Sequence, residues 1–225
     1  MRSKAQIVAR FGLLAALSLV LGYFDRAIPI TWLLGGAVPG IKLGLANTVL
    51  LYAVYLMDWK GCVLLMLAKV FLSGFMFGSM SAILYSLSGG VLSLAVMLLV
   101  KRRPRLGALV IAVLAAASDI MLLLRHPHPR GQMLWCMILI ALACTAAVAA
   151  FIVIGRRPEY AVLGTSLAGA VAHNVGQIAL AVRITETPAL WAYLPVLLIS
   201  AVLAGSFTGL GAQLILKRLD GHLKL

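Results

Sequence analysis

Six polar or ionisable residues lie within long apolar stretches of this 225-residue chain. They are Lys42, Lys69, Asp119, His173, Asn174 and Gln177. Such side chains are costly at the centre of a bilayer, and they persist there mainly where they face a partner, a cavity or a substrate. They are therefore the first candidates for binding chemistry in an apolar environment.

Three of these residues are close together in the sequence. His173 and Gln177 are four residues apart and Asn174 and Gln177 are three, so on a helix their side chains share one broad face. Either they form a hydrogen-bond network between helices, or they contact a ligand. No metal site is predicted, because a single histidine without a nearby cysteine or carboxylate is a poor ligand set.

The two lysines differ in their expected depth. Lys42 lies about one turn from the predicted outer surface, so its ammonium group either reaches the headgroups or binds an anionic solute. Pro39 and Gly40 favour the second interpretation, because they leave free backbone N–H groups just before Lys42. Asn47 follows five residues later, about 140° further around a regular helix, so one ligand contacts both only if the segment is distorted.

Lys69 is expected near the middle of its span, where it needs a carboxylate or a carbonyl oxygen as a partner. Asp119 is an acidic residue predicted to lie inside a span. Lys69 and Asp119 are therefore candidate partners of an intramembrane ion pair.

Composition identifies the surrounding medium. The chain is 63% hydrophobic and 11% charged, whereas soluble domains contain about 25% charged residues, so a single water-soluble core is excluded. The net charge of +13 is attributed to cytoplasmic loops rather than to nucleic-acid binding, because no basic run carries interleaved aromatic residues. Cys62, Cys136 and Cys144 lack metal-ligand spacing and are interpreted as packing residues.

The apolar stretches predict an all-α, polytopic membrane helix bundle, with residues 1–225 forming one transmembrane domain. Proline, glycine and charged residues separate the stretches, each long enough or nearly so to cross about 30 Å of hydrocarbon. About eight spans are expected, at residues 7–24, 38–57, 61–78, 81–100, 106–124, 132–154, 160–182 and 190–216. Lys and Arg concentrate in alternate loops, which predicts a plasma-membrane protein with both termini in the cytoplasm.

Small residues recur every four positions in two predicted helices. One row is Gly12 and Ala16, and the other is Ala168, Ala172 and Gly176. Such rows let helix backbones approach closely. The simpler interpretation is packing within the bundle, and the alternative for the first helix is docking of a partner membrane subunit.

Catalytic signatures are missing from the sequence. The six acidic residues are isolated, whereas a prenyl diphosphate synthase needs paired aspartates to hold magnesium. No phosphate-binding loop or nucleophile elbow is present. We therefore predict no catalytic residues, no cofactor and no enzymatic activity for the chain by itself.

Four segments together resemble the bacterial heptaprenyl diphosphate synthase component I family, also called the Gx transporter family. They are residues 39–47 (PGIKLGLAN), 84–94 (LYSLSGGVLSL), 169–177 (GAVAHNVGQ) and the opening segment 17–30. The resemblance covers residues 1–102 and 158–217. The family is related to the substrate-capture (S) components of energy-coupling-factor transporters, so the resemblance implies a six-helix core.

The resemblance also implies roles for particular residues. Ligand contacts are expected at Lys42, Asn47, His173, Asn174 and Gln177. Gly12 and Ala16 are expected to dock a coupling transmembrane subunit that is driven by ATPases. Residues 104–157 depart from the six-helix pattern, and we expect an inserted pair of helices there.

Two ligand-binding functions are compatible with these observations, and a structural membrane scaffold without a ligand is a third alternative. The first is capture of a small anionic or polar solute, with partner subunits supplying the energy for its uptake. The alternative is a non-catalytic membrane accessory subunit of heptaprenyl diphosphate or quinone biosynthesis.

Overall fold

The computed structural model describes residues 4–27, 46–77, 80–103 and 161–223. These residues form α-helices and one 3-10 helix, with no strand among them, so the all-α expectation is confirmed for this part of the chain. The helices are α1 (Lys4–Ala27), α3 (Asn47–Leu56), α4 (Trp59–Phe77), α5 (Met80–Arg102), α8 (Ala161–Thr185), the 3-10 helix η2 (Pro188–Tyr193) and α9 (Leu194–Leu223).

Five of these helices are long and apolar enough to cross a membrane: α1, α4, α5, α8 and α9. They correspond to the predicted spans 7–24, 61–78, 81–100, 160–182 and 190–216. The predicted spans 106–124 and 132–154, and with them the inserted helix pair, lie outside the described residues. The count of eight spans therefore stays a prediction.

The break between α3 and α4 has a local cause. The Asp58 side chain accepts a hydrogen bond from the backbone N–H of Gly61 at 3.3 Å, and its carbonyl oxygen accepts one from Cys62. Asp58 is thus the N-cap of α4, which satisfies N–H groups that have no partner within the helix. Met57, just before it, is extended and ends α3.

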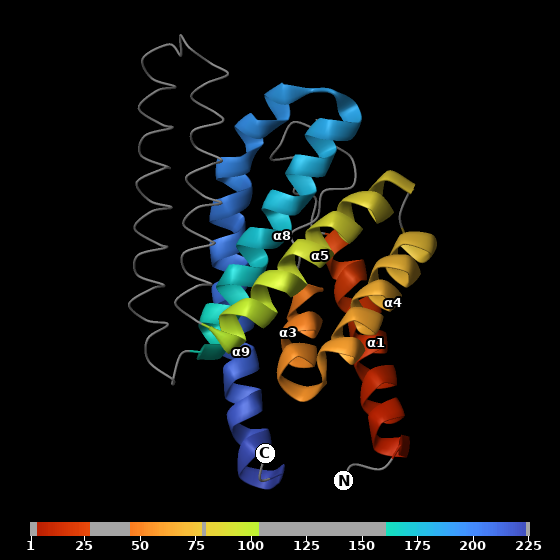
Figure 1. Cartoon of the computed structure of the whole chain (residues 1–225), viewed down its shortest axis with the longest axis vertical. Coiled ribbons are helices and arrows are strands. Elements are labelled where there is room, and N and C mark those ends of the chain that lie inside the picture. Colours follow the sequence, from red (N-terminus) through yellow and green to blue (C-terminus); the bar gives the residue numbers. More distant parts are fainter. Residues whose placement is uncertain (1–3, 28–45, 78–79, 104–160, 224–225) are drawn as a thin grey trace.

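The helices form a bundle in which α5 and α8 cross at the centre (Figure 1). Helices α8 and α9 run antiparallel and are joined by η2, while α1 and α4 lie together on the other side. The short helix α3 lies between these groups and contacts α1, α4, α5, α8 and α9. The N-terminal end of α1 and the C-terminal end of α9 lie at the same end of the bundle.

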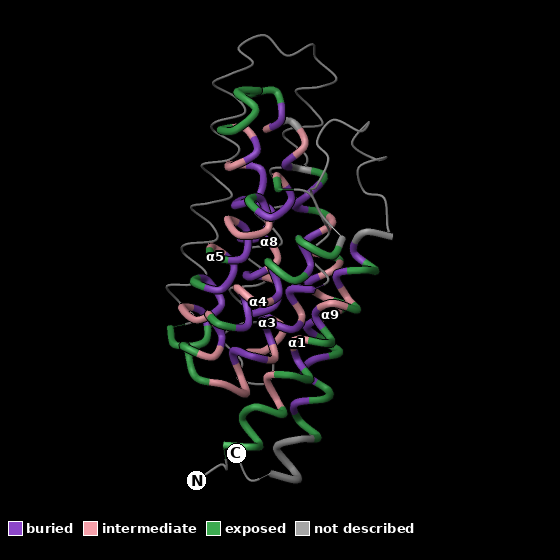
Figure 2. Tube along the Cα trace, turned by 90° about the vertical axis from the view of Figure 1, so that its right-hand side faces the viewer, coloured by how far each residue is buried: buried purple, intermediate pink, exposed green. Residues whose placement is uncertain are grey.

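Two clusters of buried apolar side chains form the core. One joins α5, α8, η2 and α9, and the other joins α1, α3, α4 and α5. Helix α5 contributes to both, with Val96 in the first and Met97 in the second. Figure 2 shows this buried region along the middle of the bundle, with exposed residues towards the chain ends.

Small residues bring α8 close to both of its neighbours. A Cβ atom added to Gly176 would lie 3.0 Å from the Cα atom of Gly89 in α5. Ala168 and Ala172 are fully buried, so this row packs inside the bundle, as the simpler interpretation predicted. On the other side, a Cβ atom on Gly205 of α9 would lie 3.2 Å from the Cα atom of Leu167.

Candidate functional site

The polar residues of α8 are buried within helix contacts. His173 is 3% exposed, and Asn174 and Gln177 are fully buried. The Nε2 atoms of Gln177 and His173 are 2.7 Å apart, so the amide N–H donates to the imidazole when the ring carries its proton on Nδ1. The missing side chain of Gly89 leaves room for this ring, because an added Cβ atom would lie 2.6 Å from its Nδ1 atom.

Asn174 faces α9 instead. Its Nδ2 atom donates to the backbone carbonyl of Leu197 at 2.6 Å. The predicted trio therefore divides between two helix contacts, with His173 at α5 and Asn174 at α9. Of the two hydrogen bonds, the one from Asn174 joins α8 to α9 and the one between Gln177 and His173 lies within α8, while ligand contact by the trio stays a prediction.

Lys69 and Asn47 form a buried pair in the other half of the bundle. The Nζ atom of Lys69 donates to the Oδ1 atom of Asn47 at 2.6 Å, and the two residues are 7% and 4% exposed. The expectation that Lys69 has a carboxylate or carbonyl partner is met by this amide carbonyl. Asp119 lies outside the described residues, so its predicted pairing with Lys69 stays a prediction. Lys42 also lies outside them.

Asp25 is an important residue that the sequence interpretation missed. It is 3% exposed near the end of α1, and its Oδ2 atom accepts a hydrogen bond from the backbone N–H of Ala46 at 3.1 Å. Ala46 is the N-cap of α3 and has no side-chain cap of its own. A carboxylate at this position also interacts favourably with the positive end of the α3 dipole.

Asp25 and Lys69 thus bind consecutive residues, Ala46 and Asn47, at the beginning of α3. A carboxylate from α1 and an ammonium group from α4 therefore both contact the start of α3, inside a bundle of span-length helices. The sequence signal for Asp25 was its position beside a long apolar stretch. It was overlooked because it lies at the boundary of the predicted first span.

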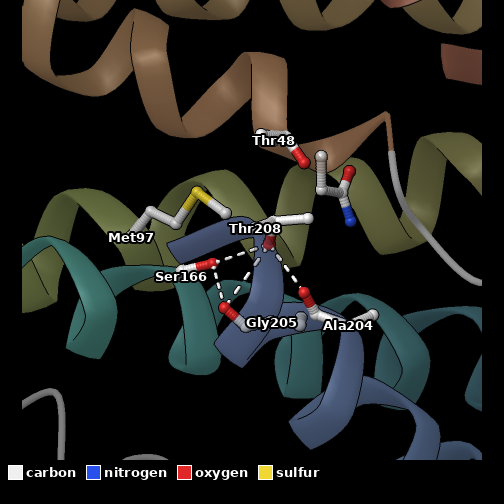
Figure 3. Close-up of a pocket in the computed structure, with 8 residues that line it drawn as sticks. Thr48, Met97, Ser166, Ala204, Gly205 and Thr208 are labelled. Carbon is white, nitrogen blue, oxygen red and sulfur yellow. Dashed lines mark hydrogen bonds between the residues drawn. The ribbon is translucent and has the colours of Figure 1, made fainter. Parts of the chain in front are cut away.

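A small pocket lies beside Asn47, where α3, α5, α8 and α9 meet (Figure 3). Its lining residues are Asn47, Thr48, Met97, Ser166, Ala170, Ala204, Gly205 and Thr208. The space available to a water-sized group is about 10 Å³, which suffices for about one water molecule. His173, Asn174 and Gln177 are not among the residues that line this pocket.

The structure therefore joins Asn47 with Lys69 and with three hydroxyl residues that the sequence interpretation did not select: Thr48, Ser166 and Thr208. Serine and threonine are common in membrane helices, where they usually bond to a carbonyl of their own helix. Their type and spacing gave no signal of a shared pocket.

The predicted docking residues of α1 are exposed, unlike the buried polar residues of α8. Gly12 and Ala16 are exposed on α1, and a Cβ atom added to Gly12 would meet nothing within 4 Å. Exposed apolar side chains surround them, including Val8 and Leu13, each 71% exposed. In contrast to the buried row of α8, this row has no neighbouring helix in the described part of the chain.

The helix bundle and its span-length apolar helices define an all-helical membrane protein. Comparison with protein families gives two overlapping matches to heptaprenyl diphosphate synthase component I, over residues 14–126 and 123–215. The chain belongs to this family, as the resemblance of its motifs indicated. No curated protein and no solved structure matches the chain.

Proposed function

We propose that the protein is a membrane protein that captures a small polar or anionic solute from outside, in the manner of an S component, and passes it inward with energy from partner subunits. The observation that carries this proposal is the buried pair of Lys69 and Asn47 beside a small pocket with hydroxyl groups in its lining. An ammonium group within a membrane bundle is expensive, and a solute-binding role is one reason for retaining it.

The form of α3 also supports solute binding. Its ten residues extend for about 15 Å, roughly half the thickness of the hydrocarbon layer. Transporters use the ends of such short helices to bind substrates and ions, because backbone groups at those ends have no partner within the helix. Lys69 and Asp25 bind at the beginning of this helix.

We further propose that α1 docks a coupling transmembrane subunit through Gly12 and Ala16, with ATPases bound to that subunit. The exposed small-residue row favours close approach of another helix. The end of the bundle with both termini would face the cytoplasm of a plasma-membrane protein. Basic residues at the end of α5 and near the end of α9 support this orientation (Lys101, Arg102, Lys217 and Arg218).

The family description favours a second candidate, an accessory membrane subunit of heptaprenyl diphosphate or quinone biosynthesis. In that case an isoprenoid chain would lie against apolar surfaces of the bundle, and the protein would bind the enzyme that makes or uses the chain. The two candidates differ in the chemistry of the bound compound and in the partner.

Mass spectrometry of small molecules retained by the purified protein tests both candidates. A water-soluble solute bound to the wild type, together with co-purification of an ATPase, supports solute capture. A retained isoprenoid supports the accessory subunit. Retention of neither class, with no change in thermal stability on addition of either, would contradict both.

Two lysine variants connect this test to the site. Lys69→Met removes the buried ammonium group, whereas Lys217→Met removes an exposed one of the same type. We expect the first variant to lose the retained solute and the second to keep it. Equal retention by both variants would remove Lys69 from the binding site.

A further inference from the structure

The pocket between α3, α5, α8 and α9 has hydrogen-bonding groups on two walls, and the Asn47 amide on one wall does not bond to the hydroxyl groups of Ser166 and Thr208 on the other. Asn47 and Thr48 line the pocket from α3. Figure 3 shows Ser166 and Thr208 on the wall formed by α8 and α9. Counting donors and acceptors on each wall indicates which chemical group fits between them.

On the wall formed by α8 and α9, each hydroxyl group has an acceptor for its proton within the wall itself. Ser166 Oγ donates to the carbonyl oxygen of Gly205 at 2.8 Å, and Thr208 Oγ1 donates to that of Ala204 at 2.8 Å. The two hydroxyl oxygens are 3.1 Å apart. Since each hydroxyl has one proton, both oxygens retain lone pairs, and this wall acts as an acceptor.

On the α3 wall, the orientation of the Asn47 amide is fixed by its partner. The ammonium group of Lys69 has only donors, so the atom that it contacts must be the carbonyl oxygen. The Nδ2 atom is therefore the other end of the amide, and it has no hydrogen-bond partner among the described residues although Asn47 is 4% exposed. Donation from Lys69 polarises the amide and strengthens Nδ2–H as a donor.

We propose that this pocket binds one hydroxyl group, supplied either by water or by an alcohol function of the solute. Its oxygen accepts a hydrogen bond from Asn47 Nδ2, and its proton is donated to Ser166 Oγ or Thr208 Oγ1. A carboxylate lacks the proton that the acceptor wall needs, and an ammonium group lacks the acceptor that Asn47 needs. A hydroxyl group supplies both, and the available space fits one.

The occupant would connect α3 to the hairpin of α8 and α9 through atoms that otherwise do not meet. It would also satisfy a buried donor, which is unfavourable to leave unpaired. This inference concerns the pocket alone and does not rest on the proposed transport function, because its occupancy is measured without any transport assay.

High-resolution structure determination of the full-length protein tests the inference, with water and then methanol as probes. We expect density within hydrogen-bonding distance of Asn47 Nδ2 and of Ser166 Oγ or Thr208 Oγ1. Density without methanol that persists unchanged in its presence identifies water as the occupant. Replacement by methanol, with its oxygen at the same position, identifies a site for alcohol groups. An empty pocket under both conditions overturns the inference.

A matched pair of variants tests the acceptor wall. Thr208→Val removes a hydroxyl group that lines the pocket, and Thr185→Val removes one that donates to its own helix in the same way but lies outside it. We expect about fivefold lower occupancy of the pocket in Thr208→Val, because one ordinary hydrogen bond to the occupant is lost. Occupancy should be unchanged in Thr185→Val.

Ser166→Ala provides the same test if Thr208→Val does not fold, because Ser166 is the other acceptor on this wall. Wild-type occupancy in whichever pocket variant folds would contradict the proposed contacts. Failure of solute uptake with an occupied pocket would contradict only the transport function, so the two proposals fail separately.

Discussion

Substitution of Gly176 by alanine adds one methyl group where α8 crosses α5. The new Cβ atom would lie 3.0 Å from the Cα atom of Gly89 and 3.0 Å from the carbonyl oxygen of Ser88. Both neighbours are backbone atoms, which cannot change rotamer to make room. The two helices must separate, and the hydrogen bond from Ser88 Oγ to the carbonyl oxygen of Gly176 is stretched as they do.

The expected loss of stability follows from two opposing effects. Overpacking of a tight contact costs about 1–3 kcal/mol, while alanine is better than glycine in a helix by up to about 1 kcal/mol. We therefore expect a net destabilisation of about 1–2 kcal/mol, which lowers the Tm by about 2–8 °C for a chain of this size. Thermal unfolding of the purified protein in detergent measures this change.

Two glycines provide controls, because an added Cβ atom at Gly12 or Gly211 meets nothing within 4 Å. Gly12→Ala and Gly211→Ala should leave the Tm unchanged or raise it slightly. If Gly176→Ala has the same Tm as these two variants, α5 and α8 are not in backbone contact at this position, and the reasoning is refuted.

Three further predictions concern polar contacts and the exposed row of α1. Asn47→Asp keeps an acceptor for Lys69 and should fold. Asn47→Leu removes that acceptor and should lower the free energy of unfolding by about 2 kcal/mol in chemical denaturation. Equal stability of the two variants would contradict the pairing of Asn47 with Lys69. Gly12→Leu should leave the Tm of the isolated chain unchanged but abolish co-purification of the coupling subunit, and normal co-purification would argue against docking through α1. Lys101→Met removes the donor to the Val54 carbonyl at 2.6 Å and the cation over the Tyr55 ring. It should lower the free energy of unfolding by about 1 kcal/mol in the same denaturation assay. Lys60→Met, at the start of α4, should have a smaller effect.

The apolar sequence pattern was sufficient to locate the long helices. A helix in lipid must satisfy its own backbone hydrogen bonds, so α1, α4, α5, α8 and α9 each required a long apolar stretch that ends at charged residues, proline or glycine. The partner of Lys69 was predictable only as a chemical type. Its identity depends on how α3 lies against α4, and Asn47 is 22 residues away in the sequence.

Other contacts of the site gave no usable signal in the sequence. Ser166 and Thr208 are ordinary helix residues by type, and only the close approach of α8 and α9 places their oxygens 3.1 Å apart. That approach depends on Gly205 and Gly209 of α9, a small-residue row that the sequence interpretation did not select.

The length of α3 explains why charged residues gather around it. A ten-residue helix has terminal N–H and C=O groups without partners in the helix itself, and the beginning of α3 is buried in the bundle. Asp25 of α1 accepts from Ala46 at the first end, and Lys101 of α5 donates to the carbonyl oxygen of Val54 near the other. These side chains come from different helices, so charged hydrogen bonds join α3 to both α1 and α5.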